Sequence, residues 1–319
     1  MKIGTDIELA AQNIREGGLV AFPTETVYGL GADAFNTQAV AKIFEAKERP
    51  TFDPLIVHIS SLQQLDYLFD KPINNLVYTL AEIFWPGPLT IVHRKNIIVS
   101  GLVTAGLDTV AVRMPSHPIA LSFINQSQRP IAAPSANKFG QLSPTRHEHV
   151  VKQNMNIDYI LQDNFGIMGL ESTVVYVEGN NCTVLRPGII TLQQLMDVIP
   201  QTKVLNKTGD KNLPSPGLLK SHYSPKKPLY LLNDDEFVFP DKSGVILHAK
   251  KNKKLNVEKL IYTSKNCNLI EVAANMFSAL HDMEENENIQ QIYIETVPEN
   301  GLGVAIMDRM KKAAYKYAV

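Results

Sequence analysis

Hydrophobic runs alternate with amphipathic segments over residues 1–201 of the chain. The run PLIVHIS (54–60) is apolar almost throughout, which is typical of a strand covered on both faces. The segment TQAVAKIFEAKE (37–48) instead places apolar residues three and four positions apart, which predicts a helix with one buried face. Because strands and helices of this kind follow one another repeatedly, the pattern predicts an α/β fold.

The other strands and helices of residues 1–201 are predicted in the same way, from shorter apolar runs and from helical spacing of apolar residues. Residues 1–18 read as the start of a strand followed by a helix. Further strands or strand ends are predicted at 17–24, 89–94, 109–115, 129–137, 172–179 and 182–188, and further helices at 73–84 and 191–199.

In the predicted helix 37–48, the spacing of the apolar residues places a cation on the buried face. Counting three and four positions on from Ile43 and Phe44 leads to Lys47, where an apolar residue is expected. Arg49 follows closely, and His58 lies inside the next strand. Because a buried cation without a partner is strongly destabilising, these side chains require an anion nearby.

The pattern breaks between residues 202 and 228. This segment is rich in Pro, Gly, Lys and Ser and has no sustained period, so it is predicted to be a linker. Beyond it the alternation resumes in a second, smaller α/β unit. Its predicted strands are 229–233, 243–250 and 290–298, and its predicted helices are 269–284 and 303–317.

Polar side chains occur where several predicted strands end or begin, namely Arg113, Ser135, Asn137, Ser172, Thr173 and Arg186. Ligands of open α/β sheets bind outside the carboxyl ends of strands. Four cations are therefore predicted to converge on one cleft: Lys47, Arg49, Arg113 and Arg186. Together with the hydroxyl groups they favour a polyanionic ligand such as a nucleoside triphosphate. The alternative, left open here, is that each cation pairs with a carboxylate such as Glu25, Asp53 or Glu171.

Composition narrows the class of protein. Lys and Arg total 31 against 32 for Asp and Glu, so there is no overall positive field for nucleic acid. The two cysteines are far apart in sequence, which argues against a disulfide framework or a cysteine metal site. The first residues lack the apolar core of a signal peptide, and no run is long enough to span a membrane. A cytoplasmic protein is expected.

Two further motifs carry less weight. Thr24 and Thr26 in FPTETVYGLGADA could offer hydroxyl groups to a ligand, although capping of the local turn explains them as well. In RHEHV, His147 and His149 are two positions apart and do not share a helix face. With no third ligand in view, we expect an exposed helix start there rather than a metal site.

A family resemblance emerges from motifs taken in order. FPTETVYGLGADA, AKERPTFDPLIVHI, WPGPLT, AVRMPSHP, APSANKFGQLSPT, ESTVV and LRPG follow one another as in the YrdC-like fold. Together they resemble the L-threonylcarbamoyladenylate synthase family, and SPGLLKSHYSP with the second unit resembles its long form. The resemblance implies a YrdC-like catalytic domain (1–201), a linker folding over the active site (202–228) and a small Rossmann-like domain (229–319). The implied catalytic fold is a twisted mixed sheet with helices around a concave cleft.

The resemblance also implies an activity. The family makes L-threonylcarbamoyl-AMP from L-threonine, bicarbonate and ATP and releases pyrophosphate. This is the first step of N6-threonylcarbamoyladenosine formation in tRNA, and a separate tRNA threonylcarbamoyl transferase complex receives the product. Mg²⁺ is expected with ATP, held by phosphate oxygens and water and by no dedicated protein ligands. A weak contact with tRNA is left open.

Site residues follow from matched motif positions. The implied catalytic residues are Lys47 and Arg49. The implied ATP-binding residues are Lys47, Arg49, Asp53, Ser135, Asn137, Ser143, Arg186, His222 and Tyr223. The implied threonine-binding residues are Thr26, His58, Arg113, Ala133, Ser172 and Thr173, with Arg113 on the carboxylate.

Two other functions remain as alternatives. The same concave basic surface could serve an RNA-binding or ribosome-associated module. A carbamoyl-adenylate former of the hydrogenase-maturation type would keep the chemistry but change the acceptor, although the zinc-finger and acylphosphatase-like regions of those proteins are not seen here. Dependence of pyrophosphate release on both threonine and bicarbonate, without tRNA, separates the synthase from the binding module.

Overall fold

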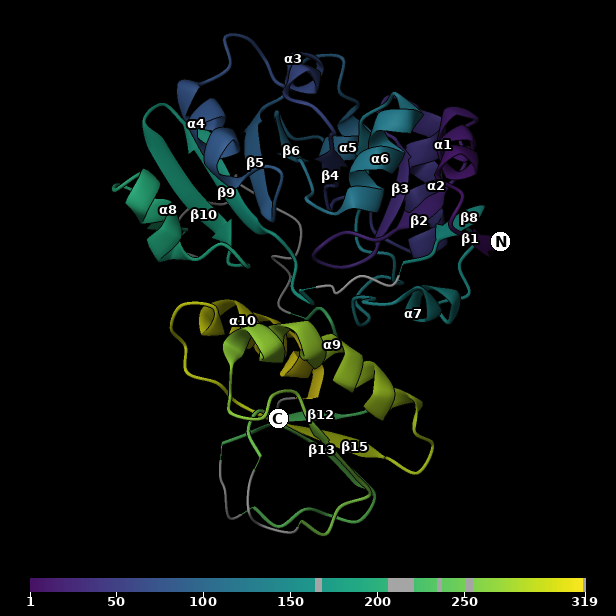
Figure 1. Cartoon of the computed structure of the whole chain (residues 1–319), viewed down its shortest axis with the longest axis vertical. Coiled ribbons are helices and arrows are strands. Elements are labelled where there is room, and N and C mark those ends of the chain that lie inside the picture. Colours follow the sequence, from purple (N-terminus) through teal and green to yellow (C-terminus); the bar gives the residue numbers. More distant parts are fainter. Residues whose placement is uncertain (164–167, 206–220, 234–236, 251–254, 318–319) are drawn as a thin grey trace.

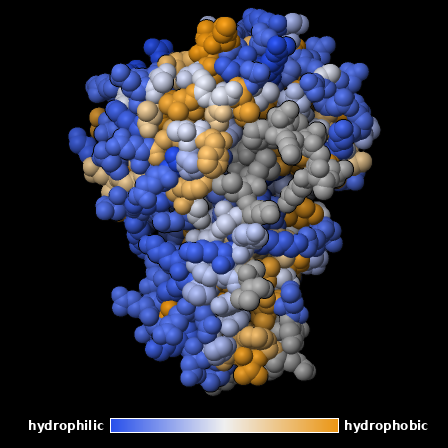
Figure 2. Space-filling model, turned by 180° about the vertical axis from the view of Figure 1, so that it is seen from behind, coloured by the Kyte–Doolittle hydropathy of each residue, from blue (hydrophilic) through white to orange (hydrophobic). Residues whose placement is uncertain are grey.

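The computed structural model describes residues 1–163, 168–205, 221–233, 237–250 and 255–317. These residues form two lobes, of which the larger contains the N-terminus and the smaller the C-terminus (Figure 1). Seen from behind, hydrophilic residues cover much of both lobes and hydrophobic residues appear in separate spots (Figure 2). None of the helices within the described ranges has the length and apolar character needed to cross a membrane.

The larger lobe is built on one mixed sheet. Its described strands run in the order β1-β8-β2-β3-β7-β4-β6-β5-β9-β10-β11. Their bounds are β1 (Lys2–Gly4), β2 (Val20–Phe22), β3 (Gly29–Asp33), β4 (Ile56–His58), β5 (Leu89–Arg94), β6 (Thr109–Arg113), β7 (Ile131–Ala132), β8 (Tyr159–Leu161), β9 (Thr173–Glu178), β10 (Asn181–Arg186) and β11 (Lys203–Val204). Parallel pairs such as β4–β6 and antiparallel pairs such as β5–β6 occur side by side. The predicted twisted mixed α/β sheet is thereby confirmed.

Helices flank this sheet (Figure 1). They are α1 (Ile7–Arg15), α2 (Thr37–Lys47), η1 (Leu62–Gln64), α3 (Leu65–Leu68), α4 (Asn75–Phe84), α5 (Gly101–Thr104), α6 (Pro118–Ser127), α7 (His147–Val151) and α8 (Leu192–Val198). In α2 the Asn36 side chain caps the first turn, and Glu48 ends the helix in a left-handed conformation with φ 53°. The apolar stripe of α2 is buried together with Lys47, as the sequence period predicted.

The smaller lobe has a parallel sheet of the order β12-β15-β13-β14. Its elements are β12 (Leu229–Leu232), β13 (Ser243–Leu247), β14 (Lys259–Tyr262), α9 (Leu269–Glu285), β15 (Gln291–Glu295), α10 (Gly303–Ala314) and η2 (Tyr315–Tyr317). Both long helices lie between this sheet and the larger lobe (Figure 1). The helix predicted at 269–284 is present as α9, and its buried residues include Val272, Met276, Leu280 and Met283.

The two lobes share a hydrophobic core. Leu142 and Leu170 from the larger lobe pack in one cluster with Tyr223 and with apolar residues of α9 and α10. Burial of apolar surface at such a contact stabilises one arrangement of the two units. Of the predicted linker 202–228, residues 206–220 lie outside the described residues, so the domain bounds and the linker's course stay predictions.

Candidate functional site

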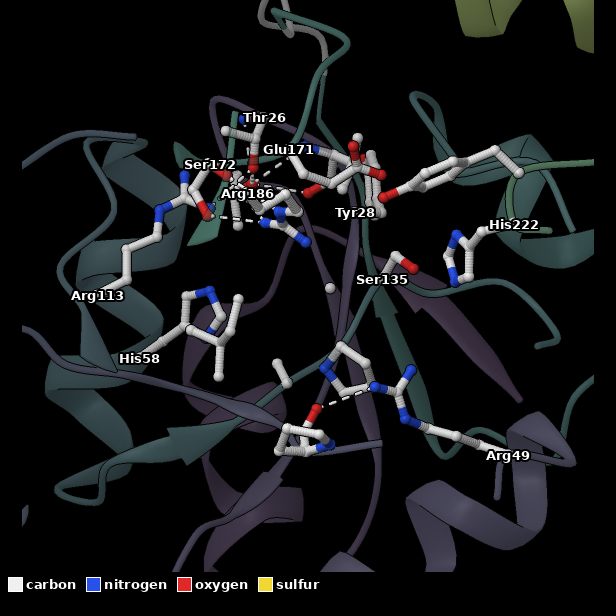
Figure 3. Close-up of a pocket in the computed structure, with 18 residues that line it drawn as sticks. Thr26, Tyr28, Arg49, His58, Arg113, Ser135, Glu171, Ser172, Arg186 and His222 are labelled. Atoms are coloured by element: carbon white, nitrogen blue, oxygen red, sulfur yellow. Dashed lines mark hydrogen bonds between the residues drawn. The ribbon is translucent and has the colours of Figure 1, made fainter. Parts of the chain in front are cut away.

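A pocket opens between the larger sheet and the segment that precedes the smaller lobe. It encloses about 590 Å³ of open space, part of it continuous with solvent. The residues that line it are Thr24, Thr26, Val27, Tyr28, Gly29, Arg49, Pro54, Ile56, His58, Arg113, Ala133, Pro134, Ser135, Glu171, Ser172, Arg186, His222 and Tyr223. Distant segments of the chain therefore meet in one hollow (Figure 3).

Strand register explains how these segments meet. In the parallel pair β4–β6, His58 stands opposite Arg113, so both side chains occupy carboxyl ends of neighbouring strands. Ser135 forms an isolated bridge with Gly29 at the start of β3. Ser172 directly precedes β9, and Arg186 ends β10, the antiparallel partner of β9. The Arg49 side chain lies across the pocket from Ser172 and Arg186 in Figure 3.

Arg113 is held on one side of the pocket by the FPTET loop. Its Nη2 lies 2.6 Å from Glu25 Oε1, and both side chains are largely buried. Its Nη1 donates to Thr26 Oγ1 at 2.9 Å, and its Nε donates to the Gly87 carbonyl at 3.3 Å. The guanidinium is therefore held in place without a ligand. The Glu25 carboxylate partly balances its charge, which agrees with the alternative that each cation pairs with a carboxylate of the chain.

Arg49 is held on the opposite side by its own loop. Its Nη2 lies 2.9 Å from Asp53 Oδ2 and donates to the Pro54 carbonyl at 2.9 Å. Its guanidinium carbon is 5.9 Å from the centre of the Phe139 ring. Burial lowers the pKa of the Arg49 guanidinium, while the Asp53 charge acts in the opposite direction. Asp53 therefore serves Arg49 and does not itself line the pocket.

Lys47 stands behind the pocket wall. Its Nζ donates to the Ser135 carbonyl at 2.6 Å and also to the Asn137 carbonyl. Burial and the nearby Arg49 charge lower the pKa of its ammonium group well below the usual value. Among the described residues that line the pocket, three of the four predicted cations are present and Lys47 is not. In this arrangement Lys47 fixes the loop that presents Ser135.

Arg186 and Glu171 form a second buried charged part of the site. Arg186 Nη2 donates to the Ser172 carbonyl at 2.9 Å and to Ser172 Oγ at 3.2 Å. Glu171 Oε1 accepts from Ser143 Oγ at 2.7 Å, and Glu171 Oε2 accepts from Arg309 Nε at 2.9 Å. Burial raises the pKa of Glu171, but the Arg309 and Arg186 charges outweigh it and lower the pKa to about 2. The carboxylate is ionised at neutral pH.

Two buried histidines of the pocket are neutral. Burial, and next the Arg113 charge, lower the pKa of His58 to about 3. Burial also lowers the pKa of His222 to about 3, with Arg49 and Lys47 adding to the effect. Within the described part of the chain, His222 Nδ1 has no hydrogen-bond partner. A neutral imidazole whose ring nitrogen lacks a protein partner can donate a hydrogen bond to a ligand or accept one from it, depending on the tautomer.

The structure brings together most of the predicted site residues. Those that line the pocket are Thr26, Arg49, His58, Arg113, Ala133, Ser135, Ser172, Arg186, His222 and Tyr223. Those that stand behind its wall are Lys47, Asp53, Asn137, Ser143 and Thr173. Of these, Thr173 Oγ1 donates to the Ile190 carbonyl at 2.6 Å, and Asn137 Nδ2 donates to the Gln141 carbonyl at 2.9 Å.

Sequence reasoning did not assign Tyr28 and Glu171 to the site. Both lie inside motifs that carry the resemblance, FPTETVYGLGADA and ESTVV, and both line the pocket. Their presence in these motifs was therefore a signal that could have assigned them to the site. The strand-end rule could not, because neither residue directly follows a predicted strand. Arg309, which holds Glu171, gave no signal because it lies 138 positions further along the chain.

The expectation of an exposed helix start at RHEHV is wrong for His149, which is 1% exposed. Its ring stacks on that of His281 from α9, with centroids 3.8 Å apart. Together with Glu285 these two histidines are, among the described residues, the group spaced closely enough to hold a metal ion. However, His149 Nε2 accepts from the Arg146 guanidinium, a cation that disfavours a metal there. The cluster is a contact between the lobes.

Comparisons with known proteins agree along nearly the whole chain. The Sua5/YciO/YrdC family model, described as telomere recombination, matches residues 12–188. The model described as threonylcarbamoyl-AMP synthase, C-terminal domain, matches residues 190–315. Threonylcarbamoyl-AMP synthase of Pyrococcus abyssi is 40% identical over 97% of this chain and 94% of its own length. The protein of that name from Bacillus subtilis is 41% identical over 97% and 92%.

A solved structure extends this similarity to three dimensions. P. abyssi Sua5, crystallised in complex with L-threonine, superimposes with a TM-score of 0.89 at 37% identity. The match covers 99% of this chain and 98% of that one, so both lobes and their relative placement are shared.

Proposed function

The chain belongs to the threonylcarbamoyl-AMP synthase family, and we propose from its pocket how it makes L-threonylcarbamoyl-AMP. The substrates are L-threonine, bicarbonate and ATP, and pyrophosphate is released. The reaction is the first step of N6-threonylcarbamoyladenosine formation in tRNA. One observation carries the residue assignment: three buried arginines from separate segments, Arg49, Arg113 and Arg186, are fixed around a single pocket.

The chemistry needs positioning more than a protein nucleophile. The amine of threonine first combines with bicarbonate to form a carbamate with loss of water. A carbamate oxygen then attacks the α-phosphorus of ATP, and the bond from that phosphorus to the pyrophosphate oxygen breaks. Both reactants are anions that repel each other, so fixed cations around one hollow stabilise their approach and the charge of the transition state.

Threonine is assigned to the Arg113 side of the pocket. Arg113 pairs with its carboxylate, because a fixed guanidinium offers two parallel donors to such a group. Thr26 and Ser172 supply hydroxyl groups beside it, and Ala133 leaves room for the small side chain. His58, neutral and opposite Arg113 in the register, accepts or donates a hydrogen bond without adding charge.

ATP is assigned to the remaining wall. Arg49 and Arg186 face its phosphates, with Ser135 beside them. His222 and Tyr223 cover the nucleotide from the segment that precedes the smaller lobe. Lys47 supports this wall from behind through two carbonyl groups. We keep Lys47 and Arg49 as residues on which turnover depends, Lys47 by positioning and Arg49 by direct contact.

Mg²⁺ is proposed to arrive as part of the substrate MgATP. The carboxylates in and beside the pocket are engaged by arginines: Glu25 by Arg113, Asp53 by Arg49 and Glu171 by Arg309. Because they are already paired, these carboxylates do not form a set of protein ligands for Mg²⁺. Mg²⁺ bound with a nucleotide retains several waters and is coordinated by phosphate oxygens. Among the described residues no set of ligands for Mg²⁺ is therefore assigned, and the ion is coordinated by the triphosphate and water.

The rest of the pathway is also part of the proposal. A separate tRNA threonylcarbamoyl transferase complex would receive the product, in the cytoplasm, and a weak tRNA contact of this chain stays a prediction. The RNA-binding alternative is less favoured, because Arg49, Arg113 and Arg186 are all buried and a nucleic-acid backbone needs exposed cations.

The experiment measures pyrophosphate release by the purified full chain. We expect release only when L-threonine, bicarbonate and MgATP are all present, with no tRNA added. The same reaction should yield an AMP adduct whose mass contains threonine and one carbonyl carbon. Pyrophosphate release indifferent to threonine and bicarbonate, together with tight RNA binding, would overturn the proposal in favour of the binding module.

A further inference from the structure

Arg309 of the smaller lobe reaches the wall of the active-site pocket. It belongs to α10, and its side chain is fully buried. Its Nε donates to Glu171 Oε2 at 2.9 Å, and its Nη1 donates to the Pro187 carbonyl at 2.7 Å. Its guanidinium carbon is 5.7 Å from the centre of the Tyr223 ring. One side chain therefore joins three segments that contribute to the pocket.

These contacts flank the Arg186–Ser172 interaction on both sides. Glu171 directly precedes Ser172, and Pro187 directly follows Arg186. Arg186 in turn donates to the Ser172 carbonyl and hydroxyl. Any shift of Glu171 or Pro187 would move one end of that interaction, because neighbouring residues of a chain share the same backbone. Arg309 thus fixes the backbone on which Arg186 is oriented.

The charge of Arg309 matters as well as its hydrogen bonds. Asp308 Oδ2 also accepts from Arg309 Nη1 at 2.8 Å. Arg309 therefore contacts two carboxylates, those of Glu171 and Asp308. Arg309 is the strongest charge that keeps Glu171 ionised, and Arg186 is the next. Without Arg309, the Glu171 carboxylate would be attracted to Arg186. A carboxylate there competes with the phosphates that Arg186 is assigned to bind.

We propose that Arg309 is a positioning residue for ATP: it holds the Glu171 carboxylate and the Pro187 carbonyl so that Arg186 stays directed at the phosphates. The smaller lobe then contributes to the reaction through a side chain that fixes the nucleotide site from behind, without touching the nucleotide. This inference rests on the proposed function and on the assignment of Arg186 to ATP.

The first test is Arg309→Met, compared with the full-length wild type. Because Arg186 is assigned to ATP and Arg113 to threonine, the KM for ATP should rise about tenfold or more. The KM for threonine should rise less because, of its assigned contacts, only Ser172 borders the disturbed segment. The matched control is Lys152→Met, which removes an exposed ion pair between the lobes at Glu285, away from the pocket. Both KM values should be unchanged in that control. An ATP KM within twofold of wild type in folded Arg309→Met overturns the proposal.

The second test asks whether Arg309 acts through Glu171. In the double variant Arg309→Met/Glu171→Gln no carboxylate competes for Arg186, so the ATP KM should fall several-fold below that of Arg309→Met. Only the part of the loss that comes from the Pro187 contact should remain. A merely structural role predicts no recovery, because the double variant retains fewer hydrogen bonds, and that result overturns the proposal. Should Arg309→Met fail to fold, Arg309→Gln keeps an N–H donor without the charge. The same tenfold rise is expected from it.

Failure of the inference and failure of the proposed function give different results. A wild-type chain that releases no pyrophosphate with threonine, bicarbonate and MgATP contradicts the function itself. A wild-type chain that turns over normally, beside an Arg309→Met variant with an unchanged ATP KM, contradicts only the role of Arg309. Direct titration of each protein with a non-hydrolysable ATP analogue gives the same comparison without turnover.

Discussion

Two edges of the pocket are built in different ways. The threonine edge, formed by Glu25, Thr26 and Arg113, comes entirely from the larger lobe. The nucleotide edge, formed by Glu171, Arg186 and Tyr223, is completed by Arg309 from the smaller lobe. Each edge pairs an inward arginine with a buried acid near it, yet only the second depends on how the lobes meet. The amino-acid site can therefore be complete when the nucleotide site is not.

The largest expected effect tests the threonine edge. In Arg113→Ala the partner of the substrate carboxylate is lost and Glu25 is left without its counterion. Truncating one member of a buried charge pair costs roughly 2–5 kcal/mol, so kcat/KM for threonine should fall roughly 30-fold to 5,000-fold. Steady-state kinetics with varied threonine measure this.

Arg94→Ala is the matched control for that change, because Arg94 is exposed and its 3.7 Å pair with Asp70 is weak. Its kinetics should equal those of the wild type. Direct titration of Arg113→Ala with an ATP analogue should give an affinity close to that of the wild type. Equal losses of threonine and ATP affinity would contradict the separation into two edges.

The threonine edge was also the easier one to predict from sequence. Arg113 stands at the end of a predicted strand, where position in an α/β sheet already suggests a ligand, and Thr26 lies in a motif that carries the family resemblance. The burial of Lys47 followed from a helical period alone, because apolar neighbours at fixed spacing define a face. Local patterns of this kind extend over a few residues and need no knowledge of the tertiary arrangement.

The nucleotide edge was harder because its decisive contact is distant in sequence. Arg309 lies in a helix that is buried nearly all round, so its hydrophobic period does not single out position 309. Nothing near Glu171 indicates a partner 138 residues away. His149 was misjudged for the same reason, since its burial is caused by His281 of the other lobe. Contacts between units are tertiary facts that local spacing does not encode.

Lys47→Met gives the next largest effect and tests the wall opposite Arg186. Without the ammonium group, the Ser135 and Asn137 carbonyls lose a charged donor, and the loop that presents Ser135 relaxes. Hydrogen bonds to charged groups contribute about 1.5–3 kcal/mol, so the ATP KM should rise roughly 10–100-fold. Kinetics with varied ATP measure it.

Lys42→Met is the control on the same helix, since Lys42 Nζ donates to the Gly17 carbonyl at 2.6 Å, away from the pocket. It should leave both KM values unchanged. The unfolding free energy of Lys47→Met should stay near that of the wild type, because removal of a buried cation offsets the lost hydrogen bonds. A Lys47→Met chain that is unfolded without ATP would show that the cation is structural.

A smaller effect should appear in the pH dependence of the contact between the lobes. Burial lowers the pKa of His149 to about 2 and that of His281 to about 4, in each case from 6.5. These values include smaller contributions to each pKa. His281, Arg146 and Lys152 also lower the pKa of His149, whereas the Ser143 carbonyl and Glu285 raise that of His281 against burial. The folded state thus binds fewer protons than the unfolded state, so stability is full above pH 6.5 and falls as the pH drops below it.

The measurement is the unfolding free energy of wild type and His149→Phe between pH 7 and pH 4.5. Phenylalanine keeps the stacked ring but does not titrate, so the variant should lose up to about 1.4 kcal/mol per pH unit of the wild-type slope. His147→Phe, on the partly exposed side of α7, should keep that slope. Identical slopes for wild type and His149→Phe would mean that His149 is not held neutral in the fold.

The smallest effect separates two roles for Ser143 at the nucleotide edge. Its hydroxyl donates to Glu171 Oε1 at 2.7 Å, whereas the family resemblance assigns it to ATP. Hydrogen bonds to charged groups contribute about 1.5–3 kcal/mol, and Arg309 still holds Glu171, so Ser143→Ala should raise the ATP KM by about tenfold, the low end of that range. Ser127→Ala, which removes a buried bond to the Phe123 carbonyl in α6, is the control without a kinetic effect. If Ser143 acts only through Glu171, Ser143→Ala adds nothing in a Glu171→Gln background. A loss that persists there assigns the hydroxyl to ATP itself and makes the nucleotide edge less dependent on Glu171 than its geometry suggests.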